Sequence, residues 1–329
     1  MDAQAAAVIT PAFEVEVVRT TRVPTLDDPA LTFDDPLGGA KGAKQIETCV
    51  LYVDIRDSSR ISVERRPQTL VRMYSAFVAA MLDCVRRERG HVRNIIGDRV
   101  MAVFDGPGCF VAAARTAALC NTVAHQILAP RLATLRQGFS FRCGIGVDYG
   151  TMLVTKAGRA RRAGEREFYR SLVWLGRPAN VASKLTDAAN KVSFVPAPAV
   201  SVLRRRPLQT LFDALRRTAA PPALAPAADL AWSDESFEQF LGACEPATLA
   251  SGEFVLRPRD PTVRGFVVNT LRGLTRSAPP VLITQAVHDG LRDALGDEEL
   301  ARHGWTRQFL GVSGYTGAVY GTDLGFAGD

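Results

Sequence analysis

The stretch CVLYVDIRDSS, residues 49–59, decides the fold because it joins an apolar run to two carboxylates. Residues 48–55 are rich in apolar and β-branched side chains, which predicts a buried strand. Asp54 ends this strand, and Asp57 follows in a short polar loop. A carboxylate at the end of a buried strand costs roughly several kcal/mol of desolvation unless a cation lies beside it. The stretch therefore predicts a cationic partner for Asp54.

Length and composition indicate ordinary globular material. The chain has 329 residues, 47% hydrophobic and 22% charged, which is enough to bury a sizeable core. No apolar run is long enough to span a bilayer, and acids stand at the start where a secretory signal carries bases. We therefore expect a cytoplasmic protein that does not bind membranes.

Charge and cysteine usage narrow the possible ligands. The net charge of +6 suits an anionic ligand such as a nucleotide but is too diffuse to indicate nucleic acid binding. The six cysteines show no C-x-x-C pairing, so we expect buried, reduced thiols. The four histidines are too scattered to indicate a zinc site.

The hydrophobic pattern alternates between strands and helices after the first strand. Apolar residues at helical spacing predict a helix over 68–88. The segments 91–96 and 99–104, separated only by the pair GD, predict a β-hairpin. The elements expected next are a helix at 109–128, strands at 141–150, 151–157 and 168–175, and a helix at about 178–190. This order predicts an α+β sandwich with helices on one face of a mostly antiparallel sheet.

Composition predicts four segments. Residues 1–45, with two DDP turns, form an arm before the domain, and residues 46–193 form its core. Residues 194–280 are rich in proline and alanine, and we expect an inserted, partly helical segment there. Residues 281–329 resume regular patterns and complete the domain.

Two acids mark a candidate metal site. Asp98 occupies the hairpin turn, and consecutive elements usually lie side by side, so we expect Asp54 and Asp98 to converge. Two carboxylates near main-chain carbonyls form a hard-oxygen site for Mg²⁺ or Mn²⁺. The amides of the loop that leads into Ser58 and Ser59 could hold phosphate oxygens. Taken singly, Asp98 is equally well a turn residue and Asp54 a helix cap.

Four blocks, in this order, resemble the class III nucleotide cyclases, the catalytic domains of adenylate and guanylate cyclases. They are VLYVDIRDSS, RGHVRNIIGDRVMAVF, FRCGIGVDYGTM and LGRPANVASKL. The blocks cover about residues 46–193, and the tail 281–321 is similar to the last helix and strands of that domain. The resemblance implies the fold of that domain, an α+β sandwich in a head-to-tail dimer.

The resemblance also implies the chemistry, that of a phosphorus-oxygen lyase. Asp54, Asp98 and the main-chain carbonyl of Ile55 would hold two Mn²⁺ or Mg²⁺ ions per site. One ion would lower the pKa of the ribose 3′-hydroxyl, and the other would brace the triphosphate. The 3′-oxygen would then attack the α-phosphorus in line and release pyrophosphate and a cyclic nucleotide.

Other implied roles fall on three further elements. Asn180 would orient the ribose, and Lys184 stands where the family usually has an arginine that stabilises the transition state. Lysine keeps that charge but lacks the bidentate fork. Arg142 matches an arginine seen at the triphosphate in some members, although a solvated strand arginine explains it equally well. The tail lacks the family's phosphate-binding lysine, and Arg307 is the nearest base.

Members of the family build each site between two protomers. One protomer supplies the metal-binding aspartates, and the other supplies the base-reading residue, Asn180 and Lys184. Both sets occur once in this chain, so the resemblance implies a homodimer with two shared sites.

The base-reading positions depart from the family pattern. Adenine-selective members carry lysine where Arg93 stands and an acid or threonine where Val173 stands; guanine-selective members carry glutamate and cysteine. Arginine only donates hydrogen bonds and Val173 offers none, which suits the two carbonyl acceptors of uracil. Tyr52 could add a stacking face or a hydroxyl. This combination resembles the bacterial pyrimidine cyclases of Pycsar antiphage defence, whose cyclic UMP or CMP activates a separate effector, and it favours UTP.

Four alternatives to a pyrimidine cyclase can be weighed at this point. The chain could be a purine cyclase with relaxed base recognition, or a catalytically silent cyclase fold that only binds nucleotide. Silent members usually lose a metal-binding aspartate or the ribose asparagine, and neither is lost here. An RNA-binding role for the basic loop 159–166 lacks the interleaved aromatic residues that stack on bases. A diguanylate cyclase would need a GG[DE]EF hairpin, and the chain has IIGDRV.

Overall fold

The structure is a computed structural model of the whole chain. The residues that it describes are 14–33, 40–134, 141–158, 170–196, 199–205, 230–249, 251–269 and 273–324. They form two compact units, one made of residues 1–191 with 278–329 and the other of Val192–Ser277. The basic loop 159–166 and the most proline- and alanine-rich stretch of the expected insert, 206–229, lie outside the described residues. In the described part, no helix is both long and apolar enough to cross a membrane.

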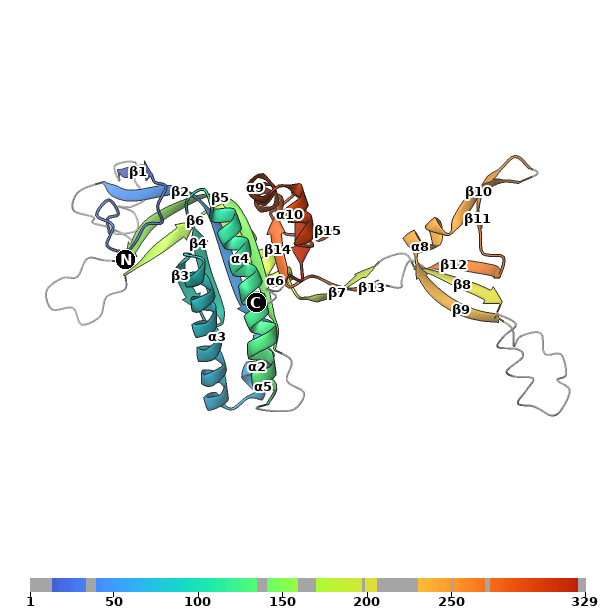
Figure 1. Cartoon of the computed structure of the whole chain (residues 1–329), viewed down its shortest axis with the longest axis horizontal. Coiled ribbons are helices and arrows are strands. Elements are labelled where there is room, and N and C mark those ends of the chain that lie inside the picture. The colour runs from blue at the N-terminus through green and yellow to red at the C-terminus, as the bar shows by residue number, and fades with distance from the viewer. Residues whose placement is uncertain are drawn as a thin grey trace, which may run out of the picture. The chain divides into compact units, whose positions relative to one another are not determined.

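The first unit is built on one nine-stranded sheet (Figure 1). Its strand order is β15-β16-β14-β5-β2-β4-β3, with β1 beside β2 and β6 beside β5. All pairs are antiparallel except β1 with β2 and β14 with β5. The strands are β1 (Val15–Arg19), β2 (Lys41–Ile55), β3 (His91–Ile96), β4 (Arg99–Phe104), β5 (Cys143–Gly158), β6 (Arg170–Leu175), β14 (Val281–Thr284), β15 (Thr306–Gln308) and β16 (Val319–Thr322). The predicted mostly antiparallel α+β fold is confirmed.

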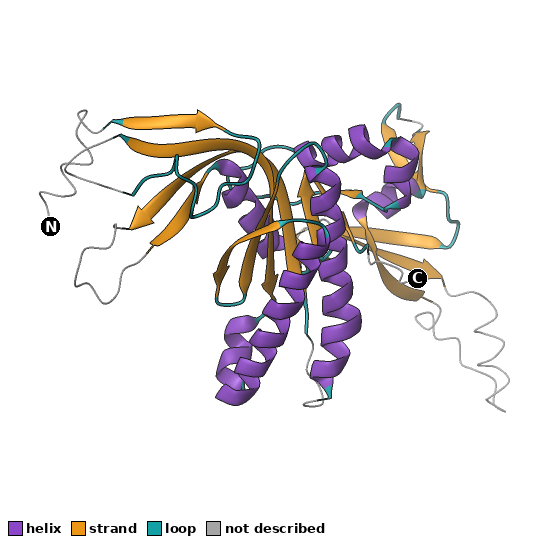
Figure 2. Cartoon of the chain, turned by 60° about the vertical axis from the view of Figure 1, so that its left-hand side comes forward, coloured by secondary structure: helices purple, strands orange, loops and turns teal. Residues whose placement is uncertain are grey.

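Helices pack on this sheet. They are α2 (Ser58–Glu64), α3 (Pro67–Arg87), α4 (Cys109–Thr122), which continues through a π-helical turn (Val123–Leu128) into α5 (Ala129–Ala133), α6 (Arg177–Ala188), α9 (Gln285–Leu295) and α10 (Asp297–Arg302). Figures 1 and 2 show α3 and α4 side by side along the sheet. The main core lies under α3, α4 and α9, where Leu51 and Val53 of β2 pack with Phe77, Ala113 and Val287.

The expectation that all helices cover one face is wrong, because α6 covers the opposite face. On that face, Ala182 of α6 packs with Val50 of β2 and Met152 of β5. Gly144 and Gly146 of β5 allow this close approach, since a Cβ at Gly146 would lie 2.3 Å from the carbonyl oxygen of Ala182. The glycines in FRCGIG therefore make room for the α6 backbone.

Two strands are longer than the sequence pattern indicates. β2 begins at Lys41 instead of residue 48, and β5 is continuous where a strand and a return strand were expected. The reason is the length of β2, which pairs with β5 residue by residue from Ala43 to Ile55. This ladder runs straight through Gly150, so the chain does not turn there.

The second unit consists mainly of strands where it is described, although we expected partly helical structure. A three-stranded sheet has the order β12-β8-β9. The unit also contains the hairpin of β10 and β11 and an antiparallel pair formed by β7 and β13, which are far apart in the sequence. Helix α8 (Phe237–Gly242) packs Phe240 against Val200 and Val202 of the three-stranded sheet. The strands are β7 (Val192–Pro196), β8 (Ala199–Arg205), β9 (Leu230–Ser236), β10 (Cys244–Thr248), β11 (Phe254–Pro258), β12 (Val263–Asn269) and β13 (Gly273–Ser277).

Candidate active site

Asp54 and Asp98 lie together at the end of β2. In the antiparallel pair of β2 and β4, Val53 is opposite Val100, so the turn that carries Asp98 lies beside the end of β2. Side chains alternate along a strand, and Val53 and Ile55 belong to the core under α3 and α4, so Asp54 points to the α6 side. The structure thus brings together the two carboxylates that the sequence assigns to a metal site.

Burial and mutual repulsion affect the ionisation of the Asp54 and Asp98 pair. Burial raises the pKa of Asp98, and the negative charge of Asp54 raises it further, although the nearby Ser58 hydroxyl opposes both. The Oδ2 atom of Asp98 is buried and has no hydrogen-bond partner among the described residues. An unpartnered carboxylate oxygen beside a second carboxylate fits a hard divalent cation. Among the described residues, no group of three or more His, Cys, Asp and Glu side chains gathers around a possible metal position.

Two arginines supply the cationic partner that the sequence predicts for Asp54. The Nη2 atom of Arg99 donates to Asp54 Oδ2 over 2.6 Å, and Nη2 of Arg56 lies 3.5 Å from the same oxygen. Sequence reasoning missed both residues. A signal for Arg99 was present, because it directly follows the turn aspartate and β4 pairs with β2 at this point.

The loop after Asp54 begins α2 and contacts β5. Asp57 adopts a left-handed backbone conformation, with φ of 58°, and α2 begins at Ser58. Ser58 lies close to Asp98, whereas Ser59 is exposed. The guanidinium of Arg142 lies 3.5 Å from Asp57 Oδ2, so the predicted triphosphate arginine is on the same edge as the carboxylates.

Helix α6 presents two sets of residues. Ser183 and Asp187 turn towards the carboxylates and accept hydrogen bonds from Arg99, over 2.7 Å and 2.5 Å. Asn180 is exposed and makes no hydrogen bond within the described chain, while Lys184 Nζ donates to the carbonyl oxygen of Ser313 over 2.7 Å. Within the described part of one chain, neither Asn180 nor Lys184 contacts Asp54 or Asp98.

The candidate base-reading residue Arg93 packs against a tryptophan. Its guanidinium carbon lies 6.0 Å from the centre of the Trp174 ring, and burial lowers the pKa of Arg93. Arg93 Nε and Trp174 Nε1 are both buried donors without a hydrogen-bond partner in the described structure. Sequence reasoning named the neighbouring Val173 and missed Trp174. The signal was the alternation of β6, which sends adjacent side chains to opposite faces.

Two further predicted site residues, Tyr52 and Arg307, lie in different parts of the first unit. Tyr52 is half-buried, packs against the same hydrophobic cluster as Trp174, and places its hydroxyl 3.2 Å from Met101 Sδ. Burial raises the pKa of Tyr52. Arg307 lies on β15 with its guanidinium 5.8 Å from the centre of the exposed Phe309 ring. Tyr52 thus packs on the same cluster as Trp174, whereas no contact in the described structure joins Arg307 to the carboxylates.

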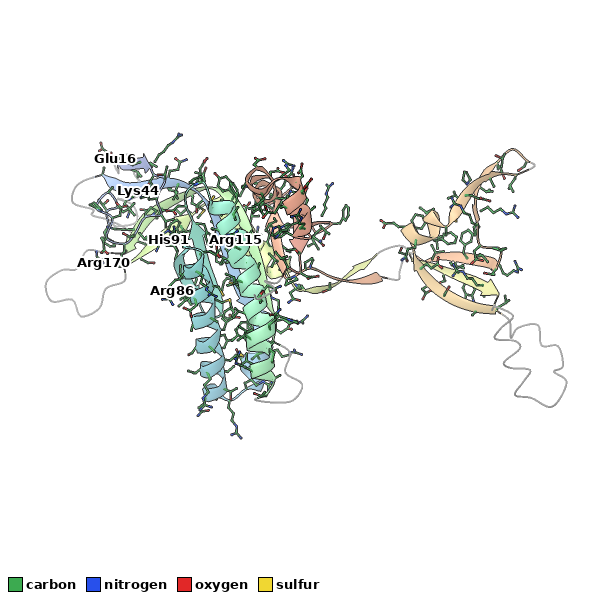
Figure 3. All side chains as sticks on the ribbon, in the orientation of Figure 1. Glu16, Lys44, Arg86, His91, Arg115 and Arg170 are labelled. Carbon is green, nitrogen blue, oxygen red and sulfur yellow. The ribbon has the colours of Figure 1, made fainter. Side chains whose placement is uncertain are left out.

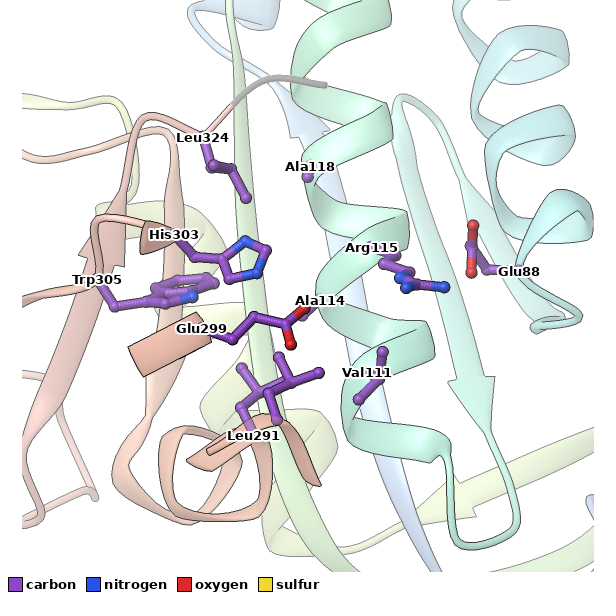
Figure 4. A pocket seen from close by; sticks show the side chains of 11 residues that line it. Glu88, Val111, Ala114, Arg115, Ala118, Leu291, Glu299, His303, Trp305 and Leu324 are labelled. Atoms are coloured by element: carbon purple, nitrogen blue, oxygen red, sulfur yellow. The ribbon is translucent and has the colours of Figure 1, made fainter. Parts of the chain in front are cut away.

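A separate cavity lies on the other face of the sheet, between α4, α9 and α10. It has a volume of about 450 Å³ and is lined by apolar residues with a few charged groups at its edge (Figure 4). Arg115 lies on α4 (Figure 3), and its side chain extends towards Glu88 at the edge of the cavity (Figure 4). Because Asp54 points to the α6 face, this cavity is not part of the carboxylate site.

Known proteins are similar in sequence to about half of this chain. The chain is 34% identical over 184 residues to a uridylate cyclase of Burkholderia cepacia, which covers 55% of this chain and 74% of the relative. It is 28% identical over 153 residues to a uridylate cyclase of Rhodovulum sp. (strain MB263), covering 45% and 61% of the two chains. A uridylate cyclase of Xanthomonas perforans is 29% identical over 152 residues, covering 46% of this chain and 63% of the relative. No protein-family model matches the chain.

Solved structures with a similar arrangement include the adenylyl cyclase CyaB from P. aeruginosa. Its TM-score is 0.47 at 13% identity, covering 85% of this chain and 95% of that one. A class III adenylyl cyclase-like ATP-binding protein from Pseudomonas aeruginosa has a TM-score of 0.44 at 21% identity, covering 58% and 40%. Both TM-scores are below 0.5, so the kinship of this chain rests on the sequence relatives.

Proposed function

Because the chain belongs to the family of the uridylate cyclases, within the class III nucleotide cyclases, we propose that it converts UTP to 3′,5′-cyclic UMP and pyrophosphate. The observation that carries this proposal is the pair formed by Asp54 and Asp98, with its buried and unpartnered carboxylate oxygen. In the reaction, a bond forms between the ribose 3′-oxygen and the α-phosphorus. The bond from the α-phosphorus to the pyrophosphate oxygen breaks, and the 3′-hydroxyl proton leaves.

The carboxylates would hold two divalent ions, Mn²⁺ or Mg²⁺, together with the main-chain carbonyl of Ile55. Such ions acidify the ribose 3′-hydroxyl and neutralise charge on the triphosphate. Asp54 and Asp98 would fix where the reacting groups meet. Ser58 and Ser59, at the start of α2, and Arg142, beside Asp57, lie on the same edge and would contact phosphate oxygens.

We further infer that the site is completed by a second copy of the chain. Asn180 and Lys184 are exposed on α6 and do not reach the carboxylates of their own chain within the described residues. In a head-to-tail homodimer, Asn180 of one protomer would orient the ribose held at the carboxylates of the other. Lys184 would then supply positive charge to the transition state, after leaving its contact with the Ser313 carbonyl.

Recognition of uracil is supported by donors that lack acceptors. Arg93 Nε and Trp174 Nε1 are buried and unpartnered among the described residues, and both can only donate. Uracil presents two carbonyl acceptors, whereas adenine and cytosine each present an exocyclic amine that needs an acceptor. A site with unpaired donors therefore favours UTP over CTP and ATP.

The product would act as a second messenger. We propose antiviral signalling as the cellular role, with a separate effector protein that binds cyclic UMP, because the sequence resembles the pyrimidine cyclases of antiphage defence. The effector would be a separate protein, and the property that we propose for it is that it binds the cyclic nucleotide product.

The decisive experiment incubates the purified chain with each of the four NTPs and Mn²⁺ and separates the products. We expect cyclic UMP as the main product, with at most a trace from the Asp98→Asn variant or with excess EDTA. Cyclic AMP at an equal or higher rate would replace the pyrimidine assignment with a purine cyclase. The absence of any cyclic product from a folded, dimeric protein would leave a nucleotide-binding protein instead of an enzyme.

A further inference from the structure

Arg99 occupies the position from which a metal ion would bind Asp54. Its Nη2 atom lies 2.6 Å from Asp54 Oδ2, and Asp54 is only 13% exposed. An arginine side chain keeps its positive charge in proteins, so Asp54 faces a charged guanidinium. In this state, the negative charge of Asp54 is balanced from within the chain.

A divalent ion and this guanidinium compete for the same carboxylate. Asp54 and Asp98 together carry at most two negative charges, while two divalent ions bring four positive ones. A guanidinium within hydrogen-bond distance of Asp54 Oδ2 would lie close to any ion bound to that carboxylate, and like charges repel in inverse proportion to their separation. Arg99 therefore stabilises the metal-free site and opposes the metal-bound one.

The carboxylate of Asp187 can bind Arg99 when a metal ion binds Asp54. The same Nη2 atom donates to Asp187 Oδ1 over 2.5 Å, and Nη1 donates to Ser183 Oγ over 2.7 Å. Because Nη2 carries two hydrogens, these bonds to α6 survive when the bond to Asp54 breaks. Asp187 is 56% exposed, so it can take up Arg99 without being buried further.

We propose that Arg99 is a positioning residue that substitutes for the metal on Asp54 and passes to Asp187 and Ser183 when metal binds. This inference rests on the metal site of the proposed function and assigns a role to residues outside it. Since Asn180 and Lys184 lie on the same helix as Asp187, the exchange links metal occupancy to the helix that would complete the partner's site.

The test titrates Mn²⁺ alone into the full-length chain by calorimetry. Arg99→Gln removes the competing cation, and we expect Mn²⁺ to bind about tenfold more tightly, the change that corresponds to a net loss of 1.4 kcal/mol of competition. Asp187→Asn removes the negative charge that draws Arg99 away, and we expect weaker Mn²⁺ binding. Arg99→Lys keeps the charge with a single ammonium, so its affinity should lie between those of wild type and Arg99→Gln.

A matched control separates the exchange from a general change of charge. Arg60→Gln removes one positive charge from the same edge, 3.9 Å from Asp57, and should leave Mn²⁺ affinity within about twofold of wild type because exposed charges are screened. The double variant Arg99→Gln with Asp187→Asn tests the coupling. If Asp187 acts through Arg99, its replacement has no further effect once Arg99 is gone.

Thermal unfolding gives a second readout. In EDTA, Arg99→Gln should unfold at a lower temperature than wild type, since Asp54 loses its balancing charge, and saturating Mn²⁺ should remove most of that difference. A contact that is only structural would lower the unfolding temperature equally with and without metal. That result, or unchanged or weaker Mn²⁺ binding by Arg99→Gln, would overturn the exchange.

Failure of the exchange and failure of the proposed function give different results. If wild type binds Mn²⁺ and Asp98→Asn does not, the metal site stands, and the Arg99 and Asp187 variants alone decide the exchange. If neither wild type nor Arg99→Gln binds Mn²⁺, the metal site and the exchange both fail.

Discussion

Gly146 of β5 lies directly against Ala182 of α6, so closely that a Cβ on Gly146 would come within 2.3 Å of the Ala182 carbonyl oxygen and 2.5 Å of the Thr186 amide nitrogen. These are backbone atoms of a helix and cannot rotate away. The contact sets the height of α6 above the sheet, and with it the distance from Ser183 and Asp187 to the end of β2.

We expect Gly146→Ala to destabilise the first unit by about 1–3 kcal/mol or more, because the helix must move to accommodate the methyl group. Thermal unfolding would show this as a drop of roughly 2–4 °C for each kcal/mol. Gly311→Ala is the matched control, since a Cβ there meets nothing within 4 Å. An unfolding temperature for Gly146→Ala equal to that of the control would mean that α6 does not rest on this strand.

The raised pKa of Asp98 leads to a prediction about stability and pH. Burial and Asp54 raise this pKa only in the folded, metal-free chain, so ionising Asp98 costs folding free energy at neutral pH. Below the ordinary pKa of an aspartate, the group is protonated in both states and the cost disappears. We therefore expect metal-free Asp98→Asn to be more stable than wild type at neutral pH, with the difference shrinking as the pH falls. Urea unfolding in EDTA at several pH values measures it.

The same substitution should remove activity. Asp98→Asn keeps the shape of the side chain but loses the charge that a divalent ion needs, so we expect cyclisation to fall by roughly a hundredfold or more. A variant that is more stable than wild type yet inactive would show that Asp98 is held in a strained, functional state. Wild-type turnover by this variant would contradict the metal site.

From β2 to α6, the order of strands and helices could be predicted from the sequence because periodicity and turn residues are local. The GD pair placed the hairpin turn, and the end of the apolar run placed Asp54. Two features of this part could not be predicted, because they depend on pairing between strands that are far apart in the sequence. The start of β2 at Lys41 and the continuity of β5 follow from the ladder between the two strands, and no local pattern records that ladder.

The carboxylates of the candidate site could be predicted, but their neighbours could not. Asp54 and Asp98 stand at element ends, where the sequence carries a signal. Arg99 of β4 reaches Asp54 of β2 and Asp187 of α6. Trp174 of β6 meets Arg93 of β3 although these two strands do not pair. Such contacts depend on three elements at once, so only coordinates reveal them.

Complementation tests the proposed sharing of sites between protomers. Asp54→Ala and Asn180→Ala chains should each be inactive alone. After random exchange, half of the dimers are mixed and each has one intact site, so we expect about a quarter of wild-type activity. Cyclic UMP formation by the mixture measures this, with subunit exchange verified by differently tagged chains. Continued inactivity despite proven exchange would argue that each site lies within one chain.

The last prediction concerns uracil recognition by Arg93 and Trp174. Trp174→Phe keeps an aromatic ring against Arg93 but deletes the indole N–H, while Arg93→Ala deletes the guanidinium. If these donors bind the uracil carbonyls, each change should lower kcat/KM for UTP by roughly ten- to a hundredfold, the cost of losing a buried hydrogen bond to a polar partner. The dependence on Mn²⁺ should stay unchanged, because neither residue touches Asp54 or Asp98 in the described structure.

Trp232→Phe is a matched control. Trp232 lies in the second unit and is 58% exposed, so this substitution should leave kcat/KM for UTP unchanged. Turnover of CTP tests the assignment of these donors further. The N4 amine of cytosine replaces a carbonyl acceptor and would face a donor, so wild type should discriminate against CTP, and Trp174→Phe or Arg93→Ala should narrow the ratio of UTP to CTP turnover. Equal losses with all four nucleotides would show that the two residues support the fold of the site without reading the base.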